Sequence, residues 1–371
     1  MIYLDNAATT LPKPASVTAA VSRALNSLAS PGRGVYAPAM RASDILLDCR
    51  IAASEIFHVP EPEQVVFTFN ATHAINLAIR SLATPDSRVL ISGFEHNAVT
   101  RSLHAIGCEV RIAGERLFDM DDTLSAFRAS IDWATLVVCT HVSNVFGYIL
   151  PIDAIAMLCR ERQLPLILDC SQSAGMIDLD FAALGADFAA MPGHKGLLGP
   201  QGTGLLLCRE NAKPLLYGGT GSDSLRQDMP PYLPDRLEAG THNMPGIAGL
   251  LAGIQAVQAR GTSAILAHER HLLSLMLEHL KGEPRLELFS DGGHNQSGVL
   301  SLRCCALDAE TLAARLGERG ICVRGGLHCA PCAHGSAGTL PDGTVRFSFS
   351  PFTTEEQVLT ACDTLLQIVN T

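Results

Sequence analysis

Positive charge is scarce in this sequence of 371 residues. Lysine and arginine together number 27 against 37 aspartates and glutamates, which gives a formal net charge of −10 at pH 7. The chain therefore lacks the domain-wide basic field that attracts nucleic-acid phosphates. We expect no nucleic-acid partner.

Long apolar runs are also missing. No stretch reaches the roughly 18 uninterrupted apolar residues that a membrane helix needs. The first ten residues, MIYLDNAATT, carry an early aspartate and lack both the basic segment and the apolar segment of a secretory signal. We expect a cytoplasmic protein without a membrane partner.

Cysteine, in contrast, is plentiful, with 12 residues scattered through apolar segments such as 136–139 and 205–208. In a chain of this length they are expected to be buried, reduced and small hydrophobic residues, rather than a disulfide framework. One close pair, Cys329 and Cys332, is weak evidence for zinc without a second pair. No metal site is predicted.

The first part of the chain alternates between two kinds of pattern. Apolar, β-rich runs occupy 65–69, 88–92, 136–141, 165–169 and 187–191, and helical spacing of apolar residues occupies 72–83, 97–106 and 153–162. Such alternation is typical of βαβ units around a buried parallel sheet. The sequence therefore predicts a large α/β domain with a mostly parallel central sheet.

The pattern changes after the Gly-rich stretch 217–222 and the Pro-rich stretch 229–234. Two long helical segments, 245–260 and 263–281, precede short strands at 286–290, 298–303, 321–325 and 344–350. A helix at 309–319 and a final helix accompany these strands. We predict a large domain over 12–248 and a smaller α+β domain formed by 1–11 and 249–371.

Lysine occurs only at positions 13, 195, 213 and 281, so each can be judged by its surroundings. Lys195 follows an apolar strand in Met-Pro-Gly-His-Lys-Gly, where small residues permit the close approach of a cofactor. Asp169 ends the apolar run 165–169, at the strand end where open α/β sheets bind ligands. A lysine with an aspartate partner for a pyridinium nitrogen is the arrangement that pyridoxal phosphate requires.

A phosphate site is predicted where the run 65–69 meets Asn70-Ala71-Thr72-His73. A strand leads there into a helix N-terminus, whose free amides and dipole favour an anion, and Thr72 adds a hydroxyl. Taken alone, the same residues are an ordinary helix cap. His96 follows the run 88–92 and could stack on a pyridoxal ring and relay protons, or be an ordinary hydrogen-bonded loop histidine.

Together these motifs resemble the class V aminotransferase family of pyridoxal-phosphate fold type I, in its cysteine desulfurase and selenocysteine lyase branch. The resemblance runs from the segment 3–10 to the helix after Pro351. It implies Lys195 as the Schiff-base lysine, Asp169 on the pyridinium nitrogen, Gln172 near the phenolic oxygen and His96 above the ring. The remaining cofactor contacts that it implies are Ala71, Thr72, His194, Asn144 and, from the other subunit of a homodimer, Thr241.

The segment Val323-Arg-Gly-Gly-Leu-His-Cys-Ala-Pro-Cys332 is similar to the short active-site loop of SufS-like desulfurases. That similarity implies Cys329 as the nucleophile and Arg324 as the clamp for the substrate carboxylate, and it adds Asn6 and Asn144 as substrate contacts. Arginine offers a planar fork that matches a carboxylate, and a nearby His328 or Arg324 would lower the pKa of the thiol.

The implied activity removes sulfur from L-cysteine, or selenium from L-selenocysteine, to give L-alanine, with a persulfide on Cys329 that an acceptor protein could withdraw. Four residues depart from the desulfurase pattern: Pro192, His73, Tyr36 and Cys332. Two other interpretations remain open. One is a class V aminotransferase or C–S lyase without a persulfide step, and the other is a non-catalytic sulfur-relay or metal-binding protein.

Overall fold

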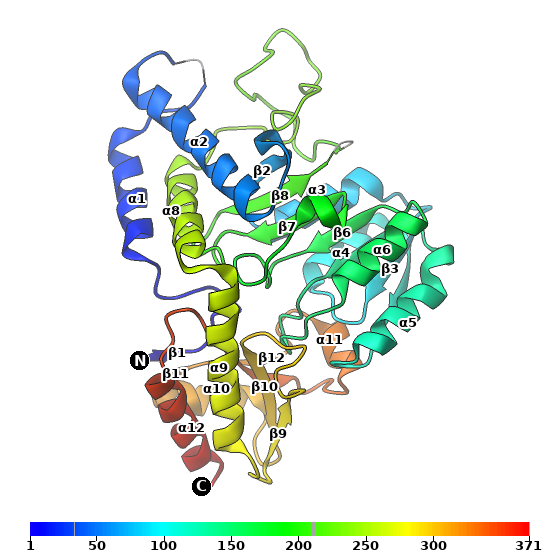
Figure 1. Cartoon of the computed structure of the whole chain (residues 1–371), viewed down its shortest axis with the longest axis vertical. Helices are drawn as coiled ribbons and strands as arrows, with labels where there is room; N and C mark the ends of the chain where they lie inside the picture. The colour runs from blue at the N-terminus through cyan, green and yellow to red at the C-terminus, as the bar shows by residue number, and fades with distance from the viewer. Residues whose placement is uncertain (33, 210–211, 371) are drawn as a thin grey trace.

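A seven-stranded sheet forms the centre of the part of the chain that the computed structural model describes, residues 1–32, 34–209 and 212–370 (Figure 1). The strand order is β2-β8-β7-β6-β5-β3-β4. In chain order the strands are β2 (Val65–Thr68), β3 (Arg88–Ser92), β4 (Glu109–Ala113), β5 (Leu136–Thr140), β6 (Leu166–Asp169), β7 (Phe188–Pro192) and β8 (Gly204–Cys208).

The sheet is mostly parallel, as the sequence predicts. Strands β4, β3, β5, β6 and β7 run parallel to one another, and β8 pairs antiparallel with both β7 and β2. Thr140, Asp169 and Ala190 are register partners at the ends of β5, β6 and β7. The carboxyl ends of these strands therefore lie at one edge of the sheet.

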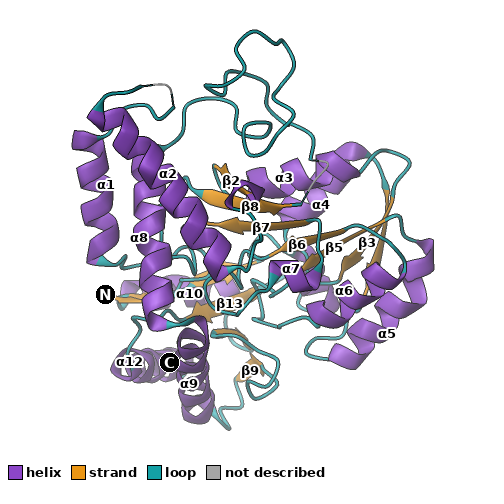
Figure 2. Cartoon of the chain, turned by 45° about the horizontal axis from the view of Figure 1, so that its top comes forward, coloured by secondary structure: helices purple, strands orange, loops and turns teal. Residues whose placement is uncertain are grey.

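Helices cover both faces of this sheet (Figure 2). Successive strand residues point to opposite faces, so Val66 packs in one hydrophobic cluster while Val65 and Phe67 pack in the other. Helices α3 and α4 contribute to the first cluster, and α2, α5, α6 and α8 contribute to the second. The helices up to this point are α1 (Ala15–Ser27), α2 (Ala37–Ile56), α3 (Ala71–Leu82), α4 (Asn97–Ile106), α5 (Met120–Ser130), α6 (Ile152–Glu161), α7 (Phe181–Leu184) and α8 (Met244–Arg260).

The C-terminal part builds a second, smaller unit with its own hydrophobic cluster. A four-stranded antiparallel sheet has the order β12-β13-β10-β9, and the N-terminal strand β1 (Ile2–Tyr3) pairs in parallel with β11. Its elements are α9 (Thr262–Leu280), β9 (Leu286–Phe289), β10 (Val299–Cys304), α10 (Ala309–Glu318), β11 (Ile321–Cys322), β12 (Arg324–Gly326), α11 (Pro331–Ser336), β13 (Thr344–Ser348) and α12 (Glu355–Val369).

The prediction of a single strand at 321–325 is wrong. The chain forms two short strands there, β11 and β12, which belong to different sheets. The change of sheet occurs at Val323, because Ile321 pairs with Ile2 while Arg324 pairs with Arg346.

The predicted boundary at residue 248 falls inside α8. Ile247, Leu250 and Ile254 of α8 all pack in a cluster of the large sheet, whereas the cluster of the smaller unit begins at Leu272 on α9. The change of hydrophobic core thus comes one helix later than the predicted boundary. The division into two domains stays a prediction.

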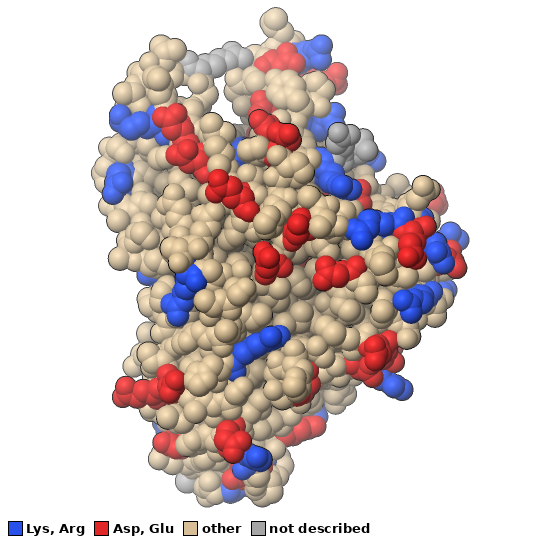
Figure 3. Space-filling view, in the orientation of Figure 1, with Lys and Arg blue, Asp and Glu red and all other residues tan. Residues whose placement is uncertain are grey.

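Charged side chains of both signs are scattered over the face seen in Figure 3, which shows no continuous basic patch in the described residues. Within the same residues, each helix is too short or too polar to span a lipid bilayer.

Candidate functional site

A small cavity of about 110 Å³ lies at the carboxyl edge of the central sheet. Eight of the predicted site residues line it: Ala71, Thr72, His96, Asn144, Asp169, Gln172, His194 and Lys195. They come from segments far apart in the sequence, and the fold brings them together where the strands β5, β6 and β7 end.

Lys195 lies three residues beyond β7 and is the only lysine that lines this cavity among the described residues. Burial lowers the pKa of its amine to about 8, and the nearby Arg346 guanidinium acts in the same direction. Asp169 opposes this effect. A larger share of the amine is therefore neutral near physiological pH than in an ordinary lysine, as covalent capture of an aldehyde requires.

Asp169 is the last residue of β6, and its side chain is buried. One carboxylate oxygen, Oδ1, accepts a hydrogen bond from the Ser171 amide at 2.9 Å. The apolar strand β6 positions a carboxylate inside the cavity wall, where it can bind a protonated ring nitrogen.

The N-terminus of α3 supplies an anion site in the same cavity. Asn70 caps the helix, and its side-chain oxygen accepts a hydrogen bond from the His73 amide at 2.9 Å. That cap leaves the first two helical amides, at Ala71 and Thr72, available to an anion. Pro192 lines the cavity without a hydroxyl. Lysine, carboxylate and anion site together fit pyridoxal phosphate.

His96 caps α4 through its ring. The Nδ1 atom accepts a hydrogen bond from the Ala98 amide at 3.0 Å, so a neutral ring carries its proton on Nε2. Burial lowers the pKa of His96, although the Asp169 carboxylate opposes this effect. The structure therefore holds a neutral, oriented imidazole at the cavity wall.

Two further residues connect the N-terminal segment to the cavity. Gln172 Nε2 donates to the Ala7 carbonyl at 3.0 Å, and His194 Nδ1 lies 3.0 Å from the Thr9 hydroxyl. Burial lowers the pKa of His194 to about 4, and the neighbouring lysines 195 and 13 add to this effect. His194 is therefore neutral, and it could bind an anion only through a hydrogen bond and not as a cation.

Asn6 lines a separate cavity of about 30 Å³ that also contains Gln172 and Lys195. Its side-chain amide donates to the Ser348 carbonyl at 3.0 Å, and its oxygen accepts from the Leu11 amide at 3.2 Å. The amide is thus already engaged in joining the N-terminal segment to β13.

Cys329 lies in the turn 327–330, which is hydrogen-bonded to the walls of the Lys195 cavity. The thiol is exposed. The Ala330 amide closes the turn on the Leu327 carbonyl at 2.9 Å, and both central residues have positive φ, 49° at His328 and 56° at Cys329. This is the sign pattern of a type I′ turn, which side chains other than glycine, asparagine and aspartate rarely adopt.

Three hydrogen bonds hold this strained turn. Asn144 Nδ2 donates to the His328 carbonyl at 2.8 Å, and the Asn97 amide donates to the Cys329 carbonyl at 2.8 Å. The His328 ring bonds the Thr344 carbonyl through Nε2 at 3.0 Å. Asn144 lines the Lys195 cavity and Asn97 follows His96, so the turn is attached to its rim.

His328 does not supply the positive charge that the sequence predicts beside the thiol. The ring is buried, and burial together with the Arg346 guanidinium lowers its pKa to about 2. A carbonyl accepts from Nε2, which places the proton of the neutral ring on that atom.

Arg324 and Arg346 share one carboxylate. Arg324 donates to Asp5 Oδ2 through Nε at 3.0 Å and Nη2 at 2.8 Å, and about half of its side chain is exposed. Arg346 is buried and donates to Asp5 Oδ1 and to the Asn144 carbonyl. Its Nε has no hydrogen-bond partner among the described residues.

Arg346 is a residue near the cavity that was not predicted from the sequence. The available signal is a lone arginine inside the apolar strand pattern TVRFSFS at 344–350. Arg346 affects the pKa of the Lys195 amine more strongly than Arg324 does. It is therefore a second candidate for the substrate carboxylate.

Thr241 does not line the Lys195 cavity. It is exposed and lines another cavity, of about 40 Å³, together with His73. Tyr36, which departs from the desulfurase pattern, is also exposed and lies at the start of α2.

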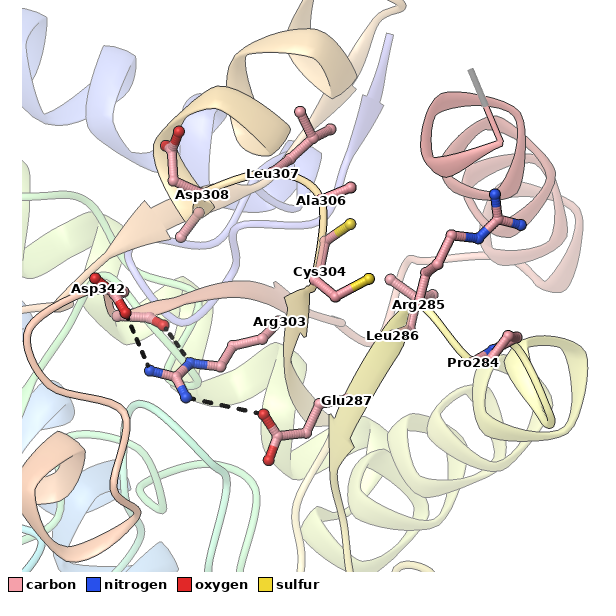
Figure 4. Close-up of a pocket in the computed structure, with 13 residues that line it drawn as sticks. Pro284, Arg285, Leu286, Glu287, Arg303, Cys304, Ala306, Leu307, Asp308 and Asp342 are labelled. Atoms are coloured by element: carbon pink, nitrogen blue, oxygen red, sulfur yellow. Dashed lines mark hydrogen bonds and ion pairs between the residues drawn. The ribbon is translucent and has the colours of Figure 1, made fainter.

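A larger cavity, of about 530 Å³, lies in the smaller unit and contains none of the predicted residues (Figure 4). Its wall includes the adjacent Cys304 and Cys305, and Arg303 reaches across it to Glu287 at 3.9 Å and Asp342 at 3.6 Å. Over the described residues, no group of three or more His, Cys, Asp or Glu side chains is arranged to hold a metal ion.

Comparison with known families agrees with the chemistry of the Lys195 cavity. Residues 2–360 match the family described as Aminotransferase class-V, and the chain belongs to this family. The family is dependent on pyridoxal phosphate, which confirms the predicted family, fold type and cofactor.

Its relatives are named for one activity. A "Probable cysteine desulfurase" from Methanothermobacter thermautotrophicus is 32% identical over 380 residues, covering 99% of this chain and 94% of the relative. A protein of the same name from Haemophilus influenzae is 32% identical over 386 residues, covering 100% of this chain and 86% of the relative.

Solved structures give the same result. The apo structure of a cysteine desulfurase from Thermococcus onnurineus NA1 has a TM-score of 0.91 and 29% identity, and covers 100% of this chain and 94% of its own. An Escherichia coli cysteine desulfurase with an S-sulfonic acid has a TM-score of 0.86 and 25% identity, with coverage of 99% and 95%. The desulfurase branch predicted from the sequence is the one for which these relatives are named.

Proposed function

We propose that this protein is a pyridoxal-phosphate-dependent cysteine desulfurase that passes the sulfur of L-cysteine to Cys329 and releases L-alanine. One observation carries the proposal: the turn 327–330 is hydrogen-bonded to Asn97 and Asn144, at the rim of the Lys195 cavity. An exposed thiol thus accompanies a cofactor site rather than lying elsewhere on the surface. A plain aminotransferase has no use for such a thiol.

The cofactor would be held by the residues that line the cavity. The amides of Ala71 and Thr72 would bind its phosphate, with His194 as a neutral hydrogen-bond partner, and Asp169 would bind the ring nitrogen. Bound there, pyridoxal phosphate supplies an electron sink that stabilises negative charge at the substrate's α carbon.

Lys195 has two tasks in the reaction. Its amine would hold the cofactor between turnovers, and it would accept the substrate's α proton at Nζ. The lowered pKa of about 8 suits both tasks, because each needs the neutral amine near physiological pH. His96, whose neutral ring carries its proton on Nε2, would stack on the ring of the bound cofactor.

Cys329 and an arginine complete the site. The Cys329 thiolate attacks the substrate sulfur, a persulfide forms on Cys329, and the substrate's carbon skeleton leaves as L-alanine. Arg324 binds the substrate carboxylate through its planar fork, with Arg346 as the buried second arginine on the shared Asp5. L-selenocysteine would enter the same site.

The chemistry of the Cys329 thiol favours an acceptor protein as partner and a reducing cell compartment. A persulfide on an exposed thiol is open to an acceptor protein, and a reduced thiol needs a reducing compartment such as the cytoplasm. We place Thr241 at the phosphate of a second copy of the chain, in a homodimer with composite sites. This placement is supported by its exposure and by its separation from the Lys195 cavity.

The test compares alanine formation from L-cysteine and from L-selenocysteine in the wild type and in Cys329→Ser, both loaded with pyridoxal phosphate. We expect alanine from both substrates in the wild type, and loss of at least 100-fold of the L-cysteine reaction in the variant, as removal of a nucleophile predicts. The visible spectrum of the bound cofactor serves as control and should be unchanged. Full L-cysteine turnover in Cys329→Ser would contradict the role of the thiol.

A further inference from the structure

Cys332 lies three residues after Cys329, at the second position of α11. Cys329 is exposed, whereas Cys332 is half-buried. The desulfurase reaction as described above gives Cys332 no role. A pair in which one thiol is open to reactants and the other is held inside the protein is typical of Cys-X-X-Cys sites that form and break a disulfide.

The segment 329–336 packs against the segment 93–97, which precedes α4. The Asn97 amide donates to the Cys329 carbonyl at 2.8 Å at one end, and the Ser336 hydroxyl donates to the Gly93 carbonyl at 2.8 Å at the other. The approach is close, because a Cβ on Gly93 would lie 2.6 Å from the Ser336 oxygen. Between these two attachments, one segment carries Cys332 and the other carries Glu95.

Glu95 is a fully buried carboxyl with spare hydrogen-bonding capacity. One oxygen, Oε1, accepts from the Ser92 hydroxyl at 2.5 Å and from the Thr140 amide at 2.8 Å. The other, Oε2, has no hydrogen-bond partner among the described residues. Burying such an atom is costly, so its retention points to a group that it meets during function.

Burial raises the pKa of both groups. Burial raises the pKa of Glu95 to about 8, which is close to that of a thiol. Burial also raises the pKa of Cys332, and the carboxylates of Glu95 and then Glu115 add to this effect. A carboxylate whose pKa is raised in this way is a stronger base toward a neighbouring thiol than an ordinary carboxylate is.

We propose that Cys332 is the resolving thiol of this enzyme and that Glu95 accepts its proton. The inference rests on the proposed function, which supplies the persulfide on Cys329. As the Cys332 proton passes to Glu95 Oε2, Cys332 Sγ attacks Cys329 Sγ. A bond forms between these two sulfurs, the bond from Cys329 Sγ to the outer sulfur breaks, and the electron pair leaves with the outer sulfur as hydrosulfide.

The step balances without an outside oxidant. The outer sulfur is reduced to sulfide while the two cysteine sulfurs are oxidised to a disulfide. A dithiol reductant then reopens the disulfide, restores both thiols and becomes a disulfide itself. The cargo thus leaves as hydrosulfide, in competition with transfer of the outer sulfur to an acceptor protein.

The spacing favours attack on the inner sulfur. Only Ala330 and Pro331 separate Cys329 from Cys332, so the chain keeps the two Cα atoms within about 11 Å of each other, and a disulfide needs them about 4.4–6.8 Å apart. The outer sulfur would extend from an exposed side chain, whereas Cys332 is half-buried.

The experiment follows one turnover of the cofactor-loaded full chain with L-cysteine, without reductant and with rapid acid quenching. Alanine and hydrosulfide are quantified, and the mass of the tryptic peptide 325–346, which contains both cysteines, is measured. In the wild type we expect one hydrosulfide per alanine and a peptide lighter by two hydrogen atoms. In Cys332→Ser we expect a peptide heavier by one sulfur atom and at least tenfold less hydrosulfide per alanine.

Two further variants sharpen the assignment. Cys305→Ser removes another exposed thiol, in the cavity of Figure 4, and should match the wild type. Glu95→Gln should slow hydrosulfide release about 100-fold near pH 8, as loss of a general base predicts, and should move the rise of that rate to the higher pH at which the Cys332 thiol ionises without a base. If Glu95→Gln released hydrosulfide at the wild-type rate, Glu95 would not be the proton acceptor. Cys332 would still be the resolving thiol.

The outcomes separate this inference from the proposed function. A persulfide on Cys329 that persists equally in the wild type and in Cys332→Ser, with alanine formed in both, overturns the resolving role alone. No alanine from the wild type overturns the proposed function, and the inference falls with it. Diamide, a strong thiol oxidant, applied to the resting wild type gives an independent check, because failure to form the disulfide between positions 329 and 332 also overturns the resolving role.

Discussion

Asp5 holds two guanidinium groups at once, and this shared contact decides how each arginine can act. Arg324 uses both Nε and Nη2 on one oxygen of Asp5 and keeps Nη1 free, in a side chain that is about half exposed. Arg346 is buried and already bonded through both terminal nitrogens. Arg324 can therefore swing toward a substrate carboxylate at lower cost.

At the scale of a single residue, we predict that Arg324→Lys raises the KM for L-cysteine about 10- to 100-fold with little change in kcat. Lysine keeps the charge but loses the planar fork, and a hydrogen bond to a charged group contributes about 1.5–3 kcal/mol. Steady-state kinetics of the cofactor-loaded enzyme measure the change. Arg303→Lys, in the separate cavity of the smaller unit, is the matched control and should leave KM unchanged. An unchanged KM in Arg324→Lys, together with a raised KM in Arg346→Lys, would transfer the role to Arg346.

At the scale of an element, the turn 327–330 is the least relaxed part of the site. Two consecutive non-glycine residues with positive φ cost about 1–2 kcal/mol each, so the turn persists only because its surroundings hold it. One restraint is the hydrogen bond from the Asn97 amide to the Cys329 carbonyl. Asn97 is the first residue of α4, a position where proline fits a helix without cost.

Asn97→Pro therefore removes one hydrogen bond and little else. We expect the first-turnover rate of persulfide formation on Cys329 to fall about 2- to 10-fold, which corresponds to about 0.5–1.5 kcal/mol for one hydrogen bond. The bound cofactor's spectrum should not change. Asn97→Ala keeps the backbone N–H and is the matched control, expected to react at the wild-type rate. Equal rates in both variants would show that this restraint does not position the thiol.

Elements differ in how well the sequence predicts them. The runs 88–92 and 165–169 predict β3 and β6 because each strand is apolar and buried. The edge strand β4 is not predicted, since its side chains are exposed apart from Ala113. The position of β8, antiparallel between β7 and β2, results from pairing of distant segments that no local pattern reveals.

The site residues also differ in how well the sequence predicts them, because local patterns do not reveal contacts between distant segments. Lys195 and Asp169 are predictable because each follows or ends a recognisable strand, where α/β sheets bind ligands. Arg346 and Glu95 are not, because their importance comes from contacts made across the fold. Arg346 meets Asp5 through the packing of the N-terminal segment on β13, and the segment that carries Glu95 meets the segment that carries Cys332 through the hydrogen bond from Ser336 to Gly93.

At the scale of the whole molecule, buried histidines should make the fold sensitive to acid. Burial lowers the pKa of His141 and His334 from 6.5 to about 4, and that of His328 to about 2. Below pH 6.5 the unfolded chain therefore binds more protons than the folded chain, and stability is lost as the pH falls from about 6.5 toward about 4. His141 alone should remove about 2 kcal/mol between pH 7.5 and pH 5.

Urea unfolding of the chain at these two pH values measures the loss. His141→Asn should show a smaller difference between them, by about 2 kcal/mol, than the wild type. His104→Asn replaces an exposed histidine at the end of α4 and should keep the wild-type difference. An undiminished difference in His141→Asn would mean that His141 does not remain neutral in the folded chain.

Mixing two inactive variants of the chain tests the proposal that each active site contains residues from two chains. Thr241 is exposed and absent from the Lys195 cavity of its own chain, whereas the proposed function places it at the phosphate of the other site. Thr241→Val should weaken cofactor binding, and Lys195→Ala should abolish the reaction. In a mixed dimer, Lys195 of the first chain and Thr241 of the second would form one intact site.

Equal mixing of the two variants, by coexpression, should therefore recover about a quarter of the wild-type activity, because about half of the dimers are mixed and each has one intact site. The two separate homodimers, assayed at the same cofactor concentration, provide the baseline. Activity no higher than the mean of the two homodimers would place Thr241 in its own chain's site or outside any site. Recovery above that mean requires that two chains share one site, because neither variant carries both residues.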